Sequence, residues 1–308
     1  MSGASKMDCT TSKSQSEGAL TILTPTLPFL KWAGGKQRLI PQYQAFFPPL
    51  ETISHYYEPF IGSAAVFFHW QPRPATLSDR NEKLIEVYQM VQQQVTAVID
   101  ALQPHRNDPD YYYAVRAQDP QNLSPVERAA RLIYLNKTCY NGLYRENSLG
   151  KFNVPFGRYK RPKICDVDRL CAASAALQGV NLVADDFAWV LDTAVAGDFL
   201  YFDPPYAPLT ATSNFTSYHR HGFDAADQYR LAQTISGLTA RGCKVMLSNS
   251  SAPLIYELYQ QPPYRLIEIQ ARRAINSKGD GRGPVKELLI LNRSEEHTSE
   301  LQSRSVIS

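Results

Sequence analysis

Short apolar runs alternate along the chain with longer segments of helical periodicity, which is the pattern of parallel α/β units. The apolar runs predict strands over 53–60, 75–78, 180–184, 198–203 and 243–249. The periodic segments predict helices from about Ser63, over 81–102, over 187–193 and over 225–241. The last two apolar runs, 264–270 and 286–291, are spaced like a terminal antiparallel pair. The pattern therefore predicts one α/β domain.

A different segment interrupts this alternation. Residues 108–138 are predicted to be helical, with a capped start at Ser124-Pro125-Val126-Glu127. Residues 140–163 are rich in glycine, asparagine, proline and aromatic residues, which predicts loops or a hairpin. We therefore expect a mainly helical domain inserted into the α/β domain.

Both ends of the chain lack the pattern of a packed domain. The first 27 residues are rich in serine and threonine and carry no apolar signal-peptide segment, which predicts a disordered leader. Residues 294–308 have no core-forming periodicity and resemble a translated sequencing adaptor, so we expect an artefactual tail. The predicted division is a leader over 1–27, a main domain over 28–85 and 165–293, an inserted domain over 86–164, and the tail.

Composition narrows the class of protein. The chain has 44% hydrophobic and 20% charged residues, which is ordinary for a globular enzyme. It has no run of about 18 apolar residues, so no membrane span is predicted. The five cysteines are odd in number and include no Cys-x-x-Cys pair, which argues against a disulfide framework and a zinc site. These features favour the reduced cytosol.

Positive charge is concentrated in one part of the chain. Residues 131–163 contain eight basic residues and one acid, a local net charge of +7 against +3 for the whole chain. Aromatic residues are interleaved with these charges at Tyr140, Tyr144, Phe152, Phe156 and Tyr159. Such a segment suits a nucleic acid, because the cations attract phosphates and the rings stack on bases. Charge alone leaves open the alternative of a solvated basic loop.

The sharpest motif is Asp203-Pro204-Pro205-Tyr206, at the end of the predicted strand 198–203. Open parallel sheets place their ligands at the carboxyl ends of the strands. There, the Asp203 carboxylate and the Pro204 carbonyl can each accept a hydrogen bond from an exocyclic amine that receives a methyl group. Tyr206 can stack on an extruded base, which returns about 1–3 kcal/mol of the few kcal/mol that extrusion costs. The alternative is a rigid turn, since aspartate and proline are ordinary turn formers.

A second motif, Glu58-Pro59-Phe60-Ile61-Gly62-Ser63, joins a predicted strand to a helix. Gly62 lets a ligand approach the backbone, and the helix N-terminus favours a carboxylate. Asp79 ends the next predicted strand, where an acid can bond ribose hydroxyls. A dinucleotide site has the same features, but Ala64 stands where its phosphate-binding pattern needs a second glycine. An S-adenosyl cofactor has no pyrophosphate and does not need that glycine.

A third motif, Lys31-Trp32-Ala33-Gly34-Gly35-Lys36, matches a P-loop only in part. Leu30 stands where the first P-loop glycine would be, and Gln37 stands where its serine or threonine would be. An NTPase is therefore disfavoured. Taken alone, Trp32 is also compatible with a core residue.

Four motifs follow one another in the chain: KWAGGK, EPFIGSAAVFF, YNGLYRENSLGKFNVPFGRYK and YFDPPYAPLTATSNFTSYH. Together they closely resemble the Dam-type DNA adenine methylases, over about residues 28–293. The resemblance implies a Rossmann-like methyltransferase core that uses S-adenosyl-L-methionine, with residues 86–164 as an inserted target-recognition domain. It also implies methylation of adenine N6 in double-stranded DNA, within GATC, by base flipping and direct in-line attack.

The resemblance assigns roles position by position. Trp32 and Lys36 match cofactor contacts, and Asp79 matches the acid on the cofactor ribose. Asp203 borders both the methionine moiety and the target amine, with Pro204 and Tyr206 beside it in the catalytic motif. The predicted cofactor site is completed by Glu58, Phe60 and Gly62.

We call the motif at residues 140–160 the recognition stretch. Within it, Tyr140 corresponds to the aromatic residue that wedges into the duplex. Arg145 corresponds to the arginine that reads a guanine, as bidentate bonding to O6 and N7 permits. The remaining predicted DNA contacts are apolar contacts to base edges (Leu143 and Pro155), phosphate contacts (Asn141 and Arg158) and one further base contact (Lys31).

Related enzymes that methylate amines share this architecture. Cytosine-N4 enzymes usually carry serine before Pro-Pro-Tyr, and glutamine methylases carry asparagine, so Asp203 favours adenine. A DNA-binding module without activity would explain the basic insertion but would leave the cofactor motifs without a role. The chain departs from the family at Ala64, in its leader and in its tail. We expect a cytoplasmic, nucleoid-associated enzyme with double-stranded DNA as its partner, and without metal, membrane or obligate protein partner.

Overall fold

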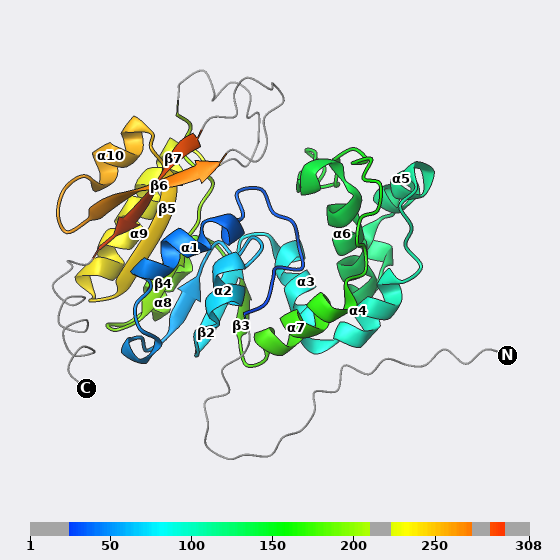
Figure 1. Cartoon of the computed structure of the whole chain (residues 1–308), viewed down its shortest axis with the longest axis horizontal. Coiled ribbons are helices and arrows are strands. Elements are labelled where there is room, and N and C mark those ends of the chain that lie inside the picture. The colour runs from blue at the N-terminus through cyan, green and yellow to red at the C-terminus, as the bar shows by residue number, and fades with distance from the viewer. Residues whose placement is uncertain (1–24, 210–222, 273–283, 293–308) are drawn as a thin grey trace, which may run out of the picture. The chain divides into compact units, whose positions relative to one another are not determined.

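The computed structural model describes residues 25–209, 223–272 and 284–292. Within these ranges the strands form one mixed sheet in the order β3-β2-β1-β4-β5-β7-β6 (Figure 1). They are β1 (Tyr56–Glu58), β2 (Ala75–Asp79), β3 (Asn181–Ala184), β4 (Phe199–Phe202), β5 (Lys244–Ser250), β6 (Arg265–Arg272) and β7 (Pro284–Leu291). β1 pairs in parallel with β2 and β4, as β4 does with β5, whereas β7 is antiparallel to β5 and β6. The predicted α/β fold, with its terminal antiparallel pair, is confirmed.

The chain packs as two compact units. We call the first the helical unit, which comprises Met1–Arg38, Gly62–Gln71 and Asn81–Ala184. We call the second the sheet unit, which comprises Leu39–Ile61, Pro72–Arg80 and Asp185–Ser308. This division follows packing alone. The functional boundaries proposed above, with a recognition domain over 86–164, stay a prediction.

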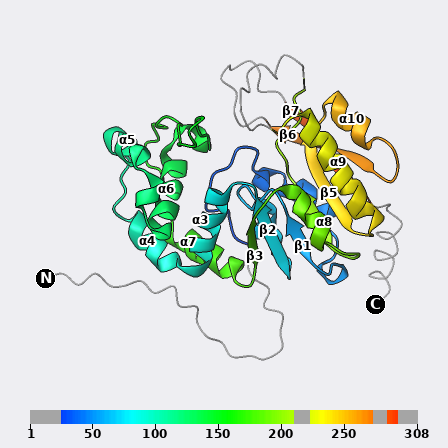
Figure 2. The same cartoon turned by 180° about the vertical axis from the view of Figure 1, so that it is seen from behind.

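Three helices of the helical unit, α3 (Glu82–Gln93), α4 (Val95–Leu102) and α5 (Pro109–Ala117), pack against a largely buried helix, α6 (Pro125–Thr138). The unit also contains α2 (Ala65–Trp70) and α7 (Val167–Leu177), with short 3₁₀ turns η1 (Lys36–Arg38), η4 (Pro120–Asn122) and η5 (Tyr140–Gly142). Both α6 and α7 pack against α3 and α4 (Figures 1 and 2). Every residue from 129 to 139 except Arg131 is buried, so α6 forms the core of this unit.

Helix caps explain where two of these helices begin. The Ser124 side chain accepts a hydrogen bond from the Glu127 backbone, and the Glu127 side chain accepts one in return, which confirms the predicted start of α6. Asn81 caps α3 in the same manner through the Leu84 backbone. The single helix predicted over 81–102 is wrong, however, because Gln94 leaves helical geometry (φ −138°, ψ 41°) and separates α3 from α4.

The helices of the sheet unit are fewer and pack on its strands. They are α1 (Ile40–Tyr43), α8 (Val190–Thr193), α9 (Ala225–Ala240) and α10 (Pro253–Tyr259), with η2 (Gln44–Phe46), η3 (Leu50–Thr52) and η6 (Phe187–Trp189). Apolar residues of β4, β5, β7 and α9 form a buried cluster that includes Leu200, Val245, Ile290 and Leu231. The predicted helix over 225–241 is confirmed, and a capping box between Asp224 and Asp227 begins it.

Other expectations have mixed outcomes. Among the helices of the described ranges, none has the length and apolar character that a membrane crossing requires. Cys139, Cys165 and Cys243 are free thiols, but Cys171 is disulfide-bonded. The expectation of reduced cysteines is therefore wrong at Cys171, because an odd count excludes complete pairing but not a single bond. The predicted leader up to residue 24 and the predicted tail over 294–308 lie outside the described residues.

Candidate active site

Three predicted site acids lie at one edge of the sheet unit. Glu58 ends β1, Asp79 ends β2, and Asp203 directly follows β4. β1 is paired in parallel between β2 and β4, so these strands present their carboxyl ends at the same edge. The chain passes from β1 to β2 on one side, while β4 lies on the other. This is a topological switch point, where open α/β sheets bind their ligands.

The loop that follows Asp203 is held by hydrogen bonds from β5 and α9. Asn249 accepts a hydrogen bond from the Ala207 backbone N–H (3.1 Å), and the Ser250 hydroxyl donates to the Ala207 carbonyl (2.6 Å). Gln228 donates to the Pro205 carbonyl (3.0 Å) and accepts from the Asn249 amide (3.0 Å). Because Asn249 and Gln228 are buried, these bonds are protected from water and hold the loop in one conformation.

Two tyrosines beside the acids are held as neutral donors. Tyr206 donates its hydroxyl to Glu287 (2.6 Å), and Tyr56 donates to the buried carboxylate of Glu58 (2.8 Å). Burial raises the pKa of both tyrosines well above the usual value, and nearby carboxylates, among them Asp203, raise it further. Both phenols therefore keep their protons. Tyr206, which follows Asp203 in the same motif, presents a neutral ring.

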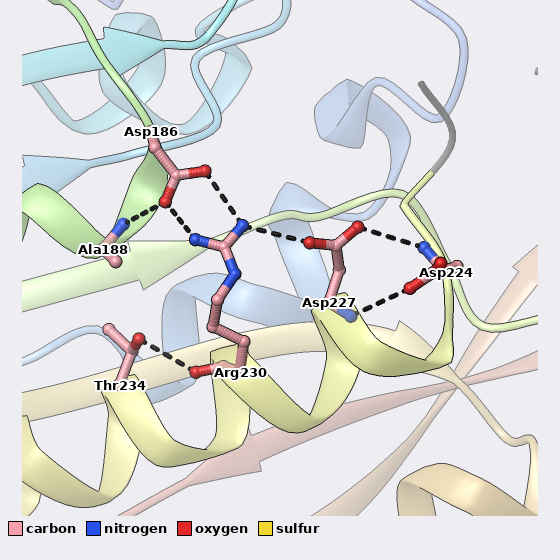
Figure 3. Close-up of polar contacts among 6 residues, drawn as sticks. All are labelled: Asp186, Ala188, Asp224, Asp227, Arg230 and Thr234. Atoms are coloured by element: carbon pink, nitrogen blue, oxygen red, sulfur yellow. Dashed lines mark hydrogen bonds and ion pairs between the residues drawn. The ribbon is translucent and has the colours of Figure 1, made fainter. Parts of the chain in front are cut away.

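An aromatic stack lies beside the same edge. Phe60 stacks on Phe187, with ring centroids 5.4 Å apart and an interplanar angle of 25°. Arg230 of α9 lies over Phe187, 4.2 Å from its ring centroid. Its guanidinium also donates two hydrogen bonds to the Asp186 carboxylate, at 2.5 and 2.9 Å (Figure 3). The Asp185 backbone N–H donates to the Asp79 carbonyl (3.2 Å). Residues 185–187 are thus fixed next to the end of β2, a feature that no sequence motif indicated.

In the helical unit, Trp32 packs tightly on Gly62. Gly62 has a φ of +44°, and a Cβ added there would meet Trp32 Cδ1 at 2.8 Å, so only glycine fits. Trp32 also stacks on Tyr144, with ring centroids 5.6 Å apart. The predicted cofactor contact Trp32 therefore lies between the glycine motif and the basic recognition stretch. Lys36 is buried and donates to the Gly34 carbonyl (2.5 Å), which closes the turn after Trp32.

Ala64 occupies a backbone position that suits glycine. Its φ of 53° and ψ of 35° are left-handed, a conformation that costs an alanine about 1–2 kcal/mol. Its methyl group is fully buried, which returns about 0.8 kcal/mol, and alanine loses less chain entropy on folding than glycine. These opposing terms nearly cancel, which explains how alanine is tolerated at this position.

Residues 140–163, predicted as loops or a hairpin, are loops that fold back on themselves through two isolated antiparallel bridges, Cys139–Phe156 and Glu146–Phe152. The Tyr140 N–H donates to the Pro155 carbonyl and the Gly157 N–H to the Thr138 carbonyl, both at 2.8 Å. Farther along, Arg145 donates to the Asn153 side chain (2.7 Å), and the Asn153 N–H donates to the Arg145 carbonyl (3.0 Å). These bonds bring the predicted DNA contacts into one element. The exposed ones are Tyr140, Arg145, Pro155 and Arg158, and the half-buried ones are Asn141 and Leu143.

Lys31 joins this element through Asn136, which the motifs did not indicate. The Asn136 side chain accepts from the Lys31 backbone N–H (2.8 Å) and donates to the Lys31 carbonyl (2.7 Å). The Lys31 ammonium lies 3.9 Å from the ring centroid of Tyr159. Burial, and then the charges of Arg169 and Lys31, lower the pKa of Lys137 to about 8. Such crowded cations favour the approach of an anion, such as a phosphate.

The count of eight basic residues over 131–163 overstates the positive charge that this segment can present to DNA. Arg131 donates its guanidinium to the carbonyls of Val115 (2.9 Å) and Arg116 (2.8 Å), so it braces α5 against α6. Burial lowers its pKa.

No cluster of three or more metal-ligating side chains occurs within the ranges that the structure describes.

Comparison with known proteins assigns the family. A sequence profile of the D12 class of N6 adenine-specific DNA methyltransferases matches residues 32–275. The chain is 41% identical over 273 residues to the type II methyltransferase M1.LlaDCHI of Lactococcus lactis subsp. cremoris, covering 86% of this chain and 95% of that protein. It is 37% identical over 267 residues to the DNA adenine methylase of Escherichia coli K12, covering 85% and 94%. The chain therefore belongs to the D12 class of N6 adenine-specific DNA methyltransferases, which use S-adenosyl-L-methionine as methyl donor.

Proposed function

We propose that this enzyme methylates the adenine of GATC in double-stranded DNA, after that base has rotated out of the duplex. The observation that carries the proposal is the position of Asp203, at the switch-point edge and at the head of a loop anchored by β5 and α9. The choice of GATC rests on the resemblance of the recognition stretch to the Dam-type enzymes. A DNA substrate also leads us to propose that the enzyme works in the cytoplasm, with the nucleoid.

The residues present fit an S-adenosyl cofactor. In the sheet unit, Asp79 ends β2 with a carboxylate for ribose hydroxyls, and Phe60 offers a half-buried aromatic face. In the helical unit, Gly62 has no side chain, which lets Trp32 pack directly on its backbone. We assign these residues to cofactor binding, with Lys36 and Glu58 as supporting charges. The bound cofactor supplies a methyl group activated by a sulfonium.

Asp203 and Pro204 act on the target amine in this proposal. The Asp203 carboxylate and the Pro204 carbonyl accept the two N6–H hydrogen bonds, which frees the nitrogen lone pair from conjugation with the ring and aligns it for attack. Tyr206 stacks on the extruded adenine while its hydroxyl stays on Glu287. Transfer is direct, without a covalent enzyme intermediate or a metal.

Residues of the recognition stretch read the target. Tyr140, half exposed at 50%, wedges into the gap left by the extruded base, and Arg145 pairs with a guanine. Lys31, beside Tyr159, is assigned to a base at the edge of the site. The remaining assignments are Leu143 and Pro155 on base edges, and Asn141 and Arg158 on phosphates.

Transfer of a labelled methyl group tests the target directly. Incubation with tritiated S-adenosyl-L-methionine is expected to label N6 of adenine in GATC duplexes, and not duplexes in which that adenine is replaced. Label on adenine in unrelated sequences would overturn the GATC assignment while leaving the family's chemistry intact.

Gly62→Ala is expected to weaken cofactor binding at least about tenfold, because the new methyl group would displace Trp32 by overpacking. Equilibrium dialysis with labelled cofactor measures this loss. Gly179→Ala is the matched control, since Gly179 also has a positive φ (+71°) but open space around its Cβ position. Equal cofactor affinities in the two variants would contradict the assignment of Trp32 and Gly62.

A further inference from the structure

A buried serine on β5 contacts the catalytic carboxylate. Asp203 follows Phe202 on β4, and Ser248 follows Leu247, the register partner of Phe202 on β5. The two side chains therefore leave adjacent parallel strands at the same level, and the Ser248 hydroxyl donates to Asp203 Oδ1 at 2.9 Å. Ser248 has no exposed surface. A hydrogen bond from a fully buried hydroxyl to a half-buried carboxylate is protected from water and strengthened by its charge.

A second hydroxyl determines the direction of this bond. The Tyr201 hydroxyl lies 3.1 Å from Ser248 Oγ, and either oxygen has the geometry to donate. Ser248 has a single proton, and among the acceptors that it can reach are Asp203 Oδ1 at 2.9 Å, the Tyr201 hydroxyl at 3.1 Å and the Phe202 carbonyl at 3.4 Å. The shortest distance and the negative charge favour Asp203. With that proton used, Tyr201 must be the donor to Ser248.

Tyr201 is suited to remain a donor. Its side chain is buried, and burial raises the pKa of its hydroxyl well above the usual value, with the negative charge of Asp203 raising it further. The phenol therefore keeps its proton near neutral pH. The result is a one-way chain of hydrogen bonds from Tyr201 through Ser248 to Asp203.

We propose that Ser248 and Tyr201 are positioning residues for methyl transfer, which fix the rotation of the Asp203 carboxylate through this hydrogen-bond chain. The proposal rests on the role given above to Asp203. Without the chain, Asp203 Oδ1 loses a buried hydrogen-bond donor, and the oxygen that meets the adenine amine is held less firmly in direction. Misalignment of that bond slows transfer, whereas DNA affinity depends on other residues.

The test separates rate from binding. Single-turnover methyl transfer to unmethylated duplex DNA of mixed sequence is measured for Ser248→Ala, Tyr201→Phe and the double variant, together with affinities for the cofactor and DNA. Ser248→Ala is expected to lower the rate at saturating cofactor about tenfold or more, as loss of a hydrogen bond to a charged group predicts, with DNA affinity unchanged. Tyr201→Phe lowers it less, and the double variant matches Ser248→Ala, because one chain is broken in each case.

Controls distinguish this proposal from simpler explanations. Ser174→Ala removes another buried serine hydroxyl, one that contacts Gln92, and is expected to keep the full rate. An unchanged rate in Ser248→Ala, or separate losses that multiply in the double variant, would overturn the chain. If Ser248→Ala does not fold, Tyr201→Phe decides alone: a slower rate with normal DNA affinity supports the proposal, and an unchanged rate overturns it.

Asp203→Ala, measured in parallel, keeps the two levels of inference apart. Loss of transfer in Asp203→Ala with a normal rate in Ser248→Ala removes only the positioning role. Retained transfer in Asp203→Ala removes the catalytic assignment itself. Because the DNA has mixed sequence, an error in the GATC assignment affects neither result.

Discussion

Asp203→Ala is expected to lower the rate of methyl transfer at least about 10³-fold while leaving DNA affinity nearly unchanged. The Asp203 carboxylate is the charged hydrogen-bond acceptor in the catalytic loop. Its loss removes the hydrogen bond from the adenine amine, which is strongest as the amine nitrogen becomes nucleophilic. The change alters neither the recognition stretch nor the basic side chains that it carries. Single-turnover rates with saturating DNA and cofactor measure the effect on the chemical step.

A matched control for this variant is available on α8. Asp192 is exposed in the same unit, and Asp192→Ala is expected to transfer methyl groups at the normal rate. A DNA-binding measurement on both variants excludes a general loss of structure. Substantial activity in Asp203→Ala would be incompatible with the proposed mechanism, because no other carboxylate is assigned to the amine.

The sheet could be predicted because apolar runs ending in polar motifs mark buried parallel strands. Helices were harder to predict. α7 has the sequence VDRLCAASAAL, in which small alanines fill the buried face and give weak periodic contrast, so it went unpredicted. α10 begins with Pro253 immediately after β5 and was missed for a similar lack of pattern. The break at Gln94 has no glycine or proline to announce it.

Motif residues could be located from the sequence because strand ends bring them to one edge. The residues that support them could not. Ser248, Asn249 and Gln228 contact the catalytic loop from β5 and α9, between 23 and 45 residues away in the chain. The one sequence signal was the polar run Ser248–Ser251 at the end of an apolar strand, where burial would demand hydrogen-bond partners. Which partners it finds depends on strand register, which only the fold supplies.

Arg145→Ala is expected to remove about 1–3 kcal/mol of discrimination at one guanine of the target, a loss of about 5- to 150-fold in preference over a substituted site. The structure holds Arg145 exposed, while Asn153 accepts from its Nε (2.7 Å) and returns a backbone hydrogen bond. This pair of hydrogen bonds orients the guanidinium before DNA arrives, so that its in-plane Nη N–H groups are placed for a bidentate contact. Competition between GATC and singly substituted duplexes measures the change.

Arg158→Ala provides the comparison that gives this result its meaning. Arg158 is also exposed in the recognition stretch, but it is assigned to a phosphate, which carries no sequence information. Its loss is expected to weaken binding to all duplexes alike and to reduce the salt dependence by about one ion. If Arg145→Ala behaved in the same way, with equal losses on every duplex, Arg145 would be a phosphate contact. Another residue of the recognition stretch, or Lys31, would then have to recognise that guanine.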